Sequence, residues 1–352
     1  KLFNANINIF ANELQNMDKS TNLIGKNLRQ LSDILSNAGY QNVNPSLLAH
    51  TLYKKFGRPL SSIATYPKSL RQFLEKNFST DVLQPILKLQ STDGTIKGLF
   101  ENEDGKLFEA AWIPAVKRMT ICVSSQAGCR FGCKFCSTGQ NGFKGNLSVY
   151  EILSQIFGLQ KPFNHIVFMG MGEPLDNFAN VKKSIEILTA WWGVSLAHRY
   201  VTISTIGLIP ELQLAIEQLS CNLAISMHSP FHDERKSIMP AENIYPIREV
   251  INMLKTQKFK HKRRLSFEYL LIKDFNDSSF HAMETGKLLK DMESHVNLNV
   301  YNPIPSQNFE APDSSTIENF RKILNLQGLR VTIRKSSGYD ISAACGMMAG
   351  SR

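Results

Sequence analysis

Strand-like and helix-like segments alternate along this chain from about residue 118 to residue 335. The segments with strand character are TICVSS, HIVFMG, YVTIST, NLAISMH, LSFEYLLI, LNVYNP and, last, VTIRK. Amphipathic helix-like segments separate them near residues 148–159, 178–191, 210–219, 246–257, 279–290 and 314–326. Such alternation builds a parallel sheet in which right-handed crossovers join the strands. The sequence therefore predicts an α/β fold, a closed or partly open barrel of roughly six strand–helix units.

Two smaller regions precede the alternating part. Three helix-like segments predict a small helical module between about residues 25 and 90, with Ser46 as a candidate N-cap and Gly57 as a candidate helix end. Residues 96–113 predict a β-hairpin that turns at Glu103–Gly105. We therefore expect a helical accessory domain (1–92), a hairpin linker (93–117) and a barrel that carries a C-terminal tail (118–352).

Chemically distinctive residues fall where the predicted strands end. In α/β barrels the functional groups come from the C-terminal ends of the strands. CRFGCKFC follows the first strand, and GMGEP, residues 170–174, follows the second. The later strand ends carry Ser204, Thr205, Ser226, Met227, His228 and Asn302. Because these ends meet at one face of a barrel, we expect a single site there.

Three closely spaced cysteines, Cys129, Cys133 and Cys136, form a C-x3-C-x2-C pattern. Thiolate ligands select zinc or an iron–sulfur cluster. A structural zinc ion takes four protein ligands, and a [4Fe–4S] cluster also normally takes four cysteines. Three cysteines would leave one iron open, so that a small molecule can bind the metal. A zinc site completed by a histidine is the alternative.

The pattern C-x3-C-x-aromatic-C, with Phe135 before the last cysteine, resembles the radical S-adenosylmethionine (SAM) enzymes, and GMGEP resembles their cofactor-contacting segment. The motifs CVSSQAGCRFGCKFCSTG, MGMGEP, STIG, SMHSP, YNP and DISAACG are more specifically similar to the RlmN/Cfr family of RNA adenosine methyltransferases, over roughly residues 95–350. The resemblance implies a partial (β/α)6 radical SAM barrel. It also implies a [4Fe–4S] cluster on the three cysteines, whose open iron chelates SAM and cleaves it to a 5′-deoxyadenosyl radical.

The same resemblance implies roles for three residues outside the cluster motif. Cys345 would take a methyl group from one SAM molecule, and a second SAM molecule would supply the radical that activates this methyl group. Cys122 would then form a disulfide with Cys345 and free the methylated base, while Glu109 would remove the ring proton. Without the resemblance, Cys122 reads as a core residue, Glu109 as a surface carboxylate and Cys345 as an exposed thiol on a mobile tail.

The resemblance further implies a set of cofactor contacts. These are Gly172, Glu173, Ser204, Ser226, Met227, His228 and Asn302. The Glu173 carboxylate could accept hydrogen bonds from the ammonium group of SAM. By itself, His228 could equally be a structural histidine at a strand end.

The net charge of +10 favours a polyanionic partner such as a nucleic acid. Candidate phosphate contacts are Arg130, Lys134, Lys144, Arg235, Lys236, Arg334, Lys335 and the basic residues of the helical module. The longest basic run, KFKHKRR at 258–264, follows a helix, so we expect a solvated loop on the opposite barrel face.

The family resemblance implies methylation at C2 of an adenosine in 23S rRNA and in tRNA, with an electron donor such as flavodoxin. Methylation at C8 of a 23S rRNA adenosine, which confers antibiotic resistance, is the alternative. A non-catalytic zinc protein that binds RNA is a more distant one. Six cysteines without a disulfide framework, no apolar run near the roughly 18 residues of a membrane span and an N-terminus that turns polar early predict a cytoplasmic protein. We expect a monomer.

Overall fold

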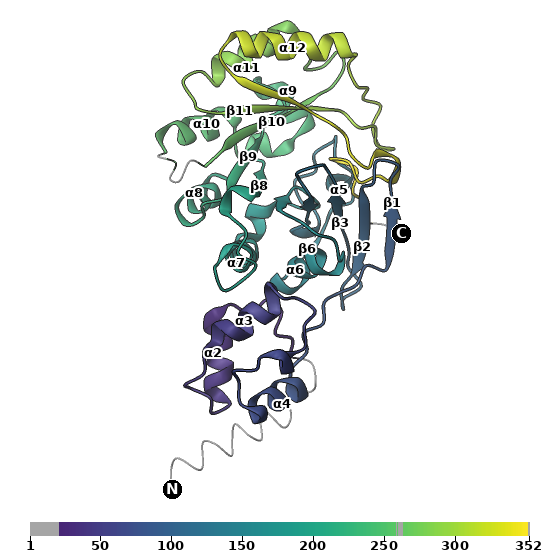
Figure 1. The fold of residues 1–352 in the computed structure, drawn as a ribbon. Helices are drawn as coiled ribbons and strands as arrows, with labels where there is room; N and C mark the ends of the chain where they lie inside the picture. The colour runs from purple at the N-terminus through teal and green to yellow at the C-terminus, as the bar shows by residue number, and fades with distance from the viewer. Residues whose placement is uncertain (1–20, 258, 260–262, 351–352) are drawn as a thin grey trace. The chain divides into compact units, whose positions relative to one another are not determined.

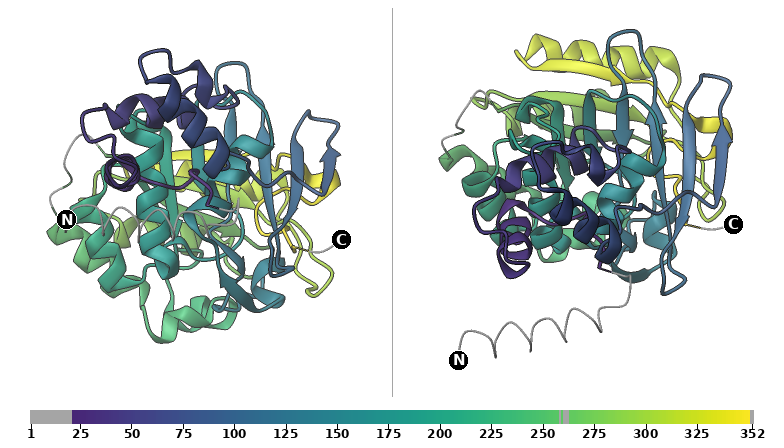
Figure 2. Two further views of the ribbon diagram at one scale, coloured as in Figure 1. Left: turned by 90° about the horizontal axis from the view of Figure 1, so that it is seen from below. Right: turned by 60° about the horizontal axis from the view of Figure 1, so that its bottom comes forward.

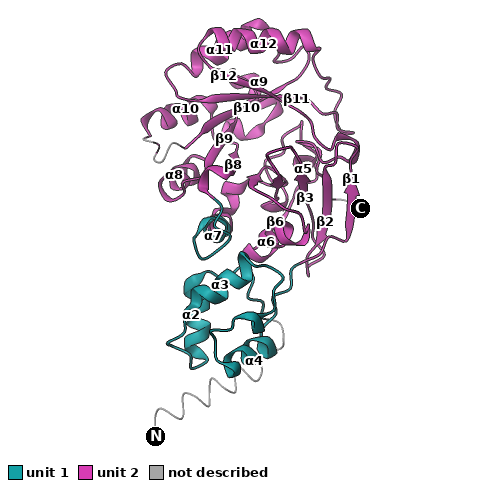
Figure 3. Cartoon of the chain, viewed as in Figure 1, with its two compact units in different colours: residues 1–82, 183–196 teal, residues 83–182, 197–352 magenta. Residues whose placement is uncertain are grey.

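The computed structural model describes residues 21–257, 259 and 263–350 (Figure 1). The polar N-terminal segment and most of the basic run at 258–264 lie outside the described residues. Two compact units make up the chain (Figure 3). The first comprises the residues up to Val82 together with Lys183–Leu196, and the second comprises Leu83–Lys182 and Ala197–Arg352. The three domains expected from the sequence stay a prediction. The two units describe only how the chain packs.

Unit 1 is helical, as predicted. It contains α2 (Leu28–Asn37), α3 (Pro45–Tyr53), the 3₁₀ turn η1 (Leu60–Ser62), α4 (Lys68–Asn77) and the last part of α7 (Phe178–Thr189). The N-cap of α3 is Asn44, not the predicted Ser46, because the Asn44 Oδ1 accepts hydrogen bonds from both the backbone N–H and the hydroxyl of Ser46. Pro45 occupies the first helical position, where its missing N–H costs nothing. The helix ends at Tyr53, before the predicted end at Gly57.

Unit 2 is built on one ten-stranded sheet in the order β1-β2-β3-β4-β7-β8-β9-β10-β11-β12. The strands are β1 (Leu87–Gln90), β2 (Ile96–Glu101), β3 (Leu107–Ile113), β4 (Thr120–Cys122), β7 (His165–Phe168), β8 (Val201–Thr205), β9 (Asn222–Ser226), β10 (Leu265–Leu271), β11 (His295–Val300) and β12 (Arg330–Arg334). All neighbouring pairs from β4 to β12 are parallel, whereas β1 to β4 pair antiparallel. The predicted partial α/β barrel and its hairpin are therefore confirmed.

Helices connect the parallel strands. They are α6 (Val149–Gly158), α7, α8 (Ile209–Gln218), α10 (Ile247–Thr256), α11 (Ser279–Leu288) and α12 (Ser314–Leu326). Figures 1 and 2 show α12 beside β12 at one end of the sheet. Every residue of the central strand β10 is buried, as expected for a parallel strand covered on both faces. No described helix has both the length and the apolar composition that a membrane span requires.

Several short elements escape prediction from the sequence. They are β1, the small ladder of β5 (Gln126–Gly128) and β6 (Phe143–Asn146), α5 (Ser137–Gln140) and α9 (His232–Ile238). The short turns η2 (Pro174–Asn177), η3 (His198–Tyr200), η4 (Pro240–Asn243) and η5 (Tyr339–Ile341) belong to the same group. The β5–β6 ladder and α5 flank the three-cysteine loop, and α9 follows the end of β9. These elements therefore support the residues that the sequence places at the site.

Candidate active site

A cavity of about 430 Å³ lies inside unit 2, lined by residues at and beyond the C-terminal ends of the parallel strands. All but two of the predicted site residues line it, as the resemblance implied. Those that line it are Cys122, Cys129, Cys133, Cys136, Gly172, Glu173, Ser204, Ser226, His228, Asn302 and Cys345. The exceptions are Met227, whose side chain is fully buried, and Glu109. Their roles, like those of the others, stay predictions.

Backbone contacts shape the three-cysteine loop. The Cys129 N–H donates to the Gly142 carbonyl (3.0 Å), and the Cys136 N–H donates to the Cys133 carbonyl (3.2 Å). Gly128, at φ +76°, precedes the loop, and a Cβ there would lie 1.9 Å from the Gly142 oxygen. Only glycine therefore allows the β5–β6 ladder to approach this closely, and the ladder fixes the start of the loop.

The cysteines of the loop share one electrostatic environment. Burial raises the pKa of Cys129 to about 12 and raises the pKa of Cys133 well above its usual value. The charges of neighbouring thiolates contribute to both shifts. Ligation requires the thiolate, so a metal centre here would bind with release of protons. Three thiols that face one cavity fit an iron–sulfur cluster.

A single zinc ion is the alternative metal for the three cysteines. A tetrahedral zinc site holds each sulfur about 2.3 Å from one centre. Across the described ranges, no three His, Cys, Asp or Glu side chains come close enough to hold one metal ion.

The segment after β7 places Glu173 against the cavity. Its buried carboxylate accepts the Leu175 N–H at Oε1 (3.0 Å) and the Ile206 N–H at Oε2 (2.9 Å). Burial raises its pKa to about 7, against the lowering effect of these hydrogen bonds. Each oxygen keeps a second lone pair, so the carboxylate can still accept an N–H from a bound cation. A Cβ at Gly172 (φ +92°) would lie 2.4 Å from the Gln126 Cβ, which requires glycine here.

His228 is held as a neutral ring. Its Nδ1 accepts the Leu270 N–H (3.0 Å), which leaves the proton on Nε2. Burial, and then the charge of Arg235, lowers its pKa to about 3. The ring meets Phe135 of the cluster motif edge to face, with 4.8 Å between centroids. Its backbone is at φ +61°, and the buried Asn276 amide donates to the His228 carbonyl (2.6 Å), which holds this strained conformation.

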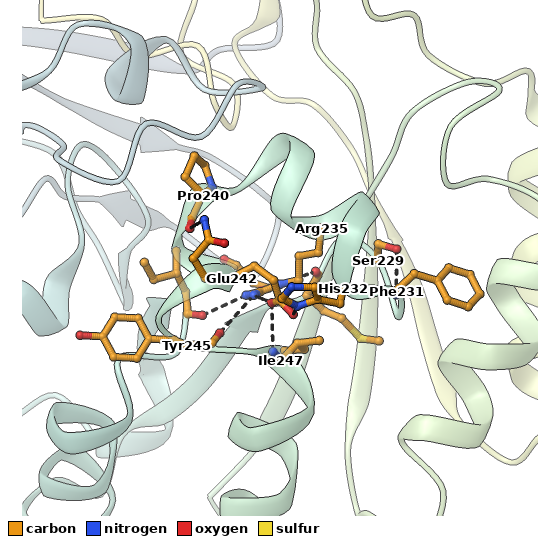
Figure 4. A network of polar contacts seen from close by, with 12 residues as sticks. Ser229, Phe231, His232, Arg235, Pro240, Glu242, Tyr245 and Ile247 are labelled. Carbon is orange, nitrogen blue, oxygen red and sulfur yellow. Dashed lines mark hydrogen bonds and ion pairs between the residues drawn. The ribbon is translucent and has the colours of Figure 1, made fainter.

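Arg235 corrects a prediction, because it is fully buried and therefore not a surface contact for phosphate. Its Nε donates to the Met227 carbonyl (2.9 Å), and Nη2 donates to the carbonyls of Ser226 (2.9 Å) and Ile206 (3.1 Å). Nη1 pairs with the Glu242 carboxylate (Figure 4). One guanidinium therefore ties together the chain after β8 and after β9, both of which line the cavity.

Glu242 completes this network. Its Oε2 also accepts the Ile247 N–H (3.0 Å), and its Oε1 contacts the Nδ1 of His232 (3.0 Å). Figure 4 shows these side chains gathered around the guanidinium. One signal in the sequence could have pointed to this network: the four charged residues of α9, Asp233 to Lys236, follow closely after a predicted cofactor segment.

Two further cysteines meet at the same cavity. Cys122 ends β4 and is buried, whereas the Cys345 side chain is exposed, and neither forms a disulfide. Burial, and then the charge of Cys345, raises the pKa of Cys122. The chain around Cys345 is docked: the Ser137 N–H donates to the Gly346 carbonyl (2.7 Å), and Asn302 Nδ2 donates to the Cys345 carbonyl (3.2 Å).

Glu109 lies on β3 and is 2% exposed, so it is not the surface carboxylate that its sequence context suggests. Its Oε1 pairs with Lys97 Nζ at 3.0 Å, and its Oε2 accepts the Ala349 N–H at 2.9 Å. Both oxygens are therefore occupied by groups of this chain.

Most of the basic residues predicted to contact RNA lie at the surface. Lys134, Lys144, Lys236 and Lys335 are exposed. Arg130 is exposed too, pairs with Asp176 (2.8 Å) and lies over the Phe143 ring. Arg334 is half-buried and lines the cavity.

Comparison with known proteins gives the class of this site. The family model of the radical SAM superfamily matches residues 123–284, which include the cluster loop and the strand ends after it. A crystal structure of a radical SAM methyltransferase from Sphaerobacter thermophilus aligns over 94% of this chain and 100% of that chain. The two are 34% identical, with a TM-score of 0.83. The fold is that of a radical SAM enzyme.

Curated relatives give the family. A probable dual-specificity RNA methyltransferase RlmN from Parabacteroides distasonis is 41% identical over 329 residues, which cover 93% of this chain and 96% of the relative. A protein of the same description from Dictyoglomus thermophilum is 39% identical over 335 residues, with coverage of 93% and 96%. The chain therefore belongs to the RlmN family of radical SAM RNA methyltransferases.

Proposed function

We propose that this enzyme methylates C2 of an adenosine in 23S rRNA and in tRNA, through a methylated Cys345. The observation that carries the proposal is the presence of Cys122 and Cys345 at the same cavity as the three-cysteine loop. A ring carbon of adenine is a poor nucleophile, so a carrier thiol beside the cofactor offers a route that direct attack on SAM does not. The description "dual-specificity" of the relatives supports two RNA substrates.

The site residues would have different roles in this reaction. Cys129, Cys133 and Cys136 would hold the [4Fe–4S] cluster, and Glu173, Ser204, Ser226 and His228 would hold SAM. When bound, the cluster and SAM supply a 5′-deoxyadenosyl radical. Cys345 would accept the methyl group from a first SAM molecule and lose its thiol proton. A second SAM molecule would supply the radical, so each turnover would use two.

Cys122 would resolve the adduct between the protein and the RNA. Its sulfur would lose the thiol proton and bond to the Cys345 sulfur, while the bond between that sulfur and the transferred carbon breaks. The carbon would keep the electron pair of the broken bond and take up a proton, which leaves a disulfide and the methylated base. The ring proton passes to a base, for which Glu109 is the candidate. Because Glu109 is 2% exposed while its Oε2 accepts the Ala349 N–H, this step requires the segment around Ala349 to move first.

The test is an isomer analysis of RNA treated with anaerobically reconstituted enzyme. We expect 2-methyladenosine by mass spectrometry of nuclease digests, whereas 8-methyladenosine alone would overturn the regiochemistry. Cys345→Ala should still cleave SAM but transfer no methyl group, and Cys122→Ala should trap a covalent complex with RNA. Normal turnover by Cys122→Ala would exclude the two-cysteine route.

Other expectations are separate from this test. A flavodoxin-like electron donor, a monomeric state and a cytoplasmic location stay predictions. Iron and zinc analysis of anaerobically purified protein separates the proposal from a zinc protein that binds RNA, because the cluster would give about four irons per chain.

A further inference from the structure

The segment that carries Cys345 is docked on the hairpin sheet along much of its length. Ahead of Cys345, the Gly338 N–H donates to Asp93 Oδ2 (3.0 Å), and Asp340 Oδ2 accepts the Thr92 N–H (3.0 Å). Both partners lie in the turn between β1 and β2. The hairpin therefore does more than link two regions, because it forms a surface on which the chain after β12 rests.

An ion pair on this hairpin contacts the segment on both sides of Cys345. Lys97 on β2 and Glu109 on β3 pair at 3.0 Å, and their side chains are 10% and 2% exposed. Lys97 Nζ also donates a long hydrogen bond to the Ser342 carbonyl (3.4 Å), three residues before Cys345. Glu109 Oε2 accepts the Ala349 N–H (2.9 Å), four residues after it.

The two contacts depend on each other. A buried carboxylate that loses its cationic partner is costly to keep ionised. The ion pair also fixes the orientation of the carboxylate, and with it the oxygen that accepts the Ala349 N–H. Lys97 therefore acts on the segment twice, directly at Ser342 and through Glu109 at Ala349.

We propose that Lys97 is a positioning residue which, through Glu109, holds residues 342–349 so that Cys345 lies at the cavity wall. Docking of the segment also keeps the Glu109 carboxylate from solvent, because its side chain is 2% exposed while its Oε2 accepts the Ala349 N–H. Departure of the segment frees one carboxylate oxygen. The link to proton removal rests on the proposed function, whereas the positioning of the segment does not.

The experiment is hydrogen–deuterium exchange of the iron-loaded protein under anaerobic conditions. Lys97→Met should accelerate exchange in the peptide that covers residues 342–350 by about tenfold, since it weakens the hydrogen bond that protects the Ala349 amide. Lys97→Arg keeps the charge and should restore most of the protection. The matched control is Lys273→Met, which breaks an exposed Lys–Glu pair of nearly the same length (2.9 Å) away from the segment.

Two further measurements make the result decisive. Exchange in the peptide that covers β10 reports global folding, and it should be unchanged in Lys97→Met. The double variant Lys97→Met/Glu109→Gln should exceed the larger single effect by less than twofold, because the two residues act as one unit. Unchanged exchange at 342–350 in Lys97→Met would overturn the proposal, and so would acceleration of equal size in β10. Neither readout needs RNA or turnover, so failure here is distinct from failure of the proposed function.

Discussion

Arg235 shows how one buried side chain can organise several strand ends. A guanidinium has five N–H donors and no acceptor, and all of its nitrogens find partners here. Four of the five hydrogen bonds go to backbone carbonyls, and the fifth goes to Glu242. In the sequence, Arg235 and Lys236 are adjacent basic residues, and nothing in the local pattern shows that one is buried and the other exposed. The partners that separate them are distant in the chain and come together only in the fold.

Replacement of Arg235 should therefore be far more costly than replacement of its neighbour. Arg235→Met removes the cationic partner of Glu242, whose side chain is 1% exposed, and we expect a loss of about 3–5 kcal/mol in the free energy of unfolding. Lys236→Met should change it by less than about 0.5 kcal/mol. Urea unfolding followed by circular dichroism measures both. Equal, small losses would show that the network contributes little.

The neutral state of His228 predicts a dependence of stability on pH. The folded pKa is about 3, below the usual 6.5, so at mildly acidic pH the unfolded chain takes up a proton here that the folded chain does not. Stability from this residue is complete above about pH 6.5 and declines as the pH falls toward 3. In iron-free protein, the melting temperature should fall more between pH 7.5 and 5.5 than it does in His228→Gln. Parallel curves for the two proteins would contradict this assignment.

Glycines decide the geometry of the elements around the cluster loop. Gly128 and Gly132 both have positive φ, at +76° and +61°. A Cβ at Gly128 would collide with the Gly142 carbonyl, whereas a Cβ at Gly132 meets nothing within 4 Å. An alanine at Gly128 would therefore meet both a steric clash and backbone strain, whereas an alanine at Gly132 would meet backbone strain alone.

Alanine substitutions at these glycines should have different results. Gly132→Ala adds only the cost of a left-handed backbone, about 1 kcal/mol, and should keep its iron. Gly128→Ala must also push the β5–β6 ladder apart, and we expect it to lose more than half of its bound iron after anaerobic reconstitution. Iron-to-protein ratios measure both. Equal iron content in the two variants would show that the ladder does not fix the cysteines.

Elements of this fold differ in how well the sequence predicts them. The parallel strands and their connecting helices are predictable because short segments rich in Val, Ile and Leu alternate with segments of helix length along the chain. The β5–β6 ladder is not, since Gln-Ala-Gly and Phe-Lys-Gly-Asn lack any alternation. The strand-end residues of the site follow from topology. The Lys97–Glu109 pair does not, because its contacts to Ser342 and Ala349 span 240 residues or more.

At the scale of the whole molecule, charge governs the encounter with RNA. The net charge is +10, and exposed lysines lie within the cluster motif (Lys134) and shortly after it (Lys144). Each phosphate contact contributes about 0.7 to 0.9 to the slope of log affinity against log salt concentration. Binding of RNA should therefore weaken steeply between 50 and 200 mM salt, by roughly tenfold or more.

Single substitutions can divide this slope among residues. Lys134→Ala and Lys144→Ala should each lower it by about one unit and weaken binding similarly across RNA sequences. Lys255→Ala, in the last turn of α10 and away from the cluster motif, is the control and should leave the slope unchanged. Fluorescence anisotropy over a salt series measures the slopes. An effect of Lys255→Ala as large as that of Lys134→Ala would place the RNA elsewhere.

The antiparallel pairing of β3 with β4 sets Ala111 opposite Cys122, so Glu109 stands two residues along a strand bonded directly to the one that carries this thiol. The Cys122 sulfur and the Glu109 carboxylate therefore come from two strands that are hydrogen-bonded to each other, whereas Cys345 lies on the segment after β12. In the proposed reaction cycle, only the segment that carries Cys345 would move. Its position, docked or released, would then set the order of the chemical steps.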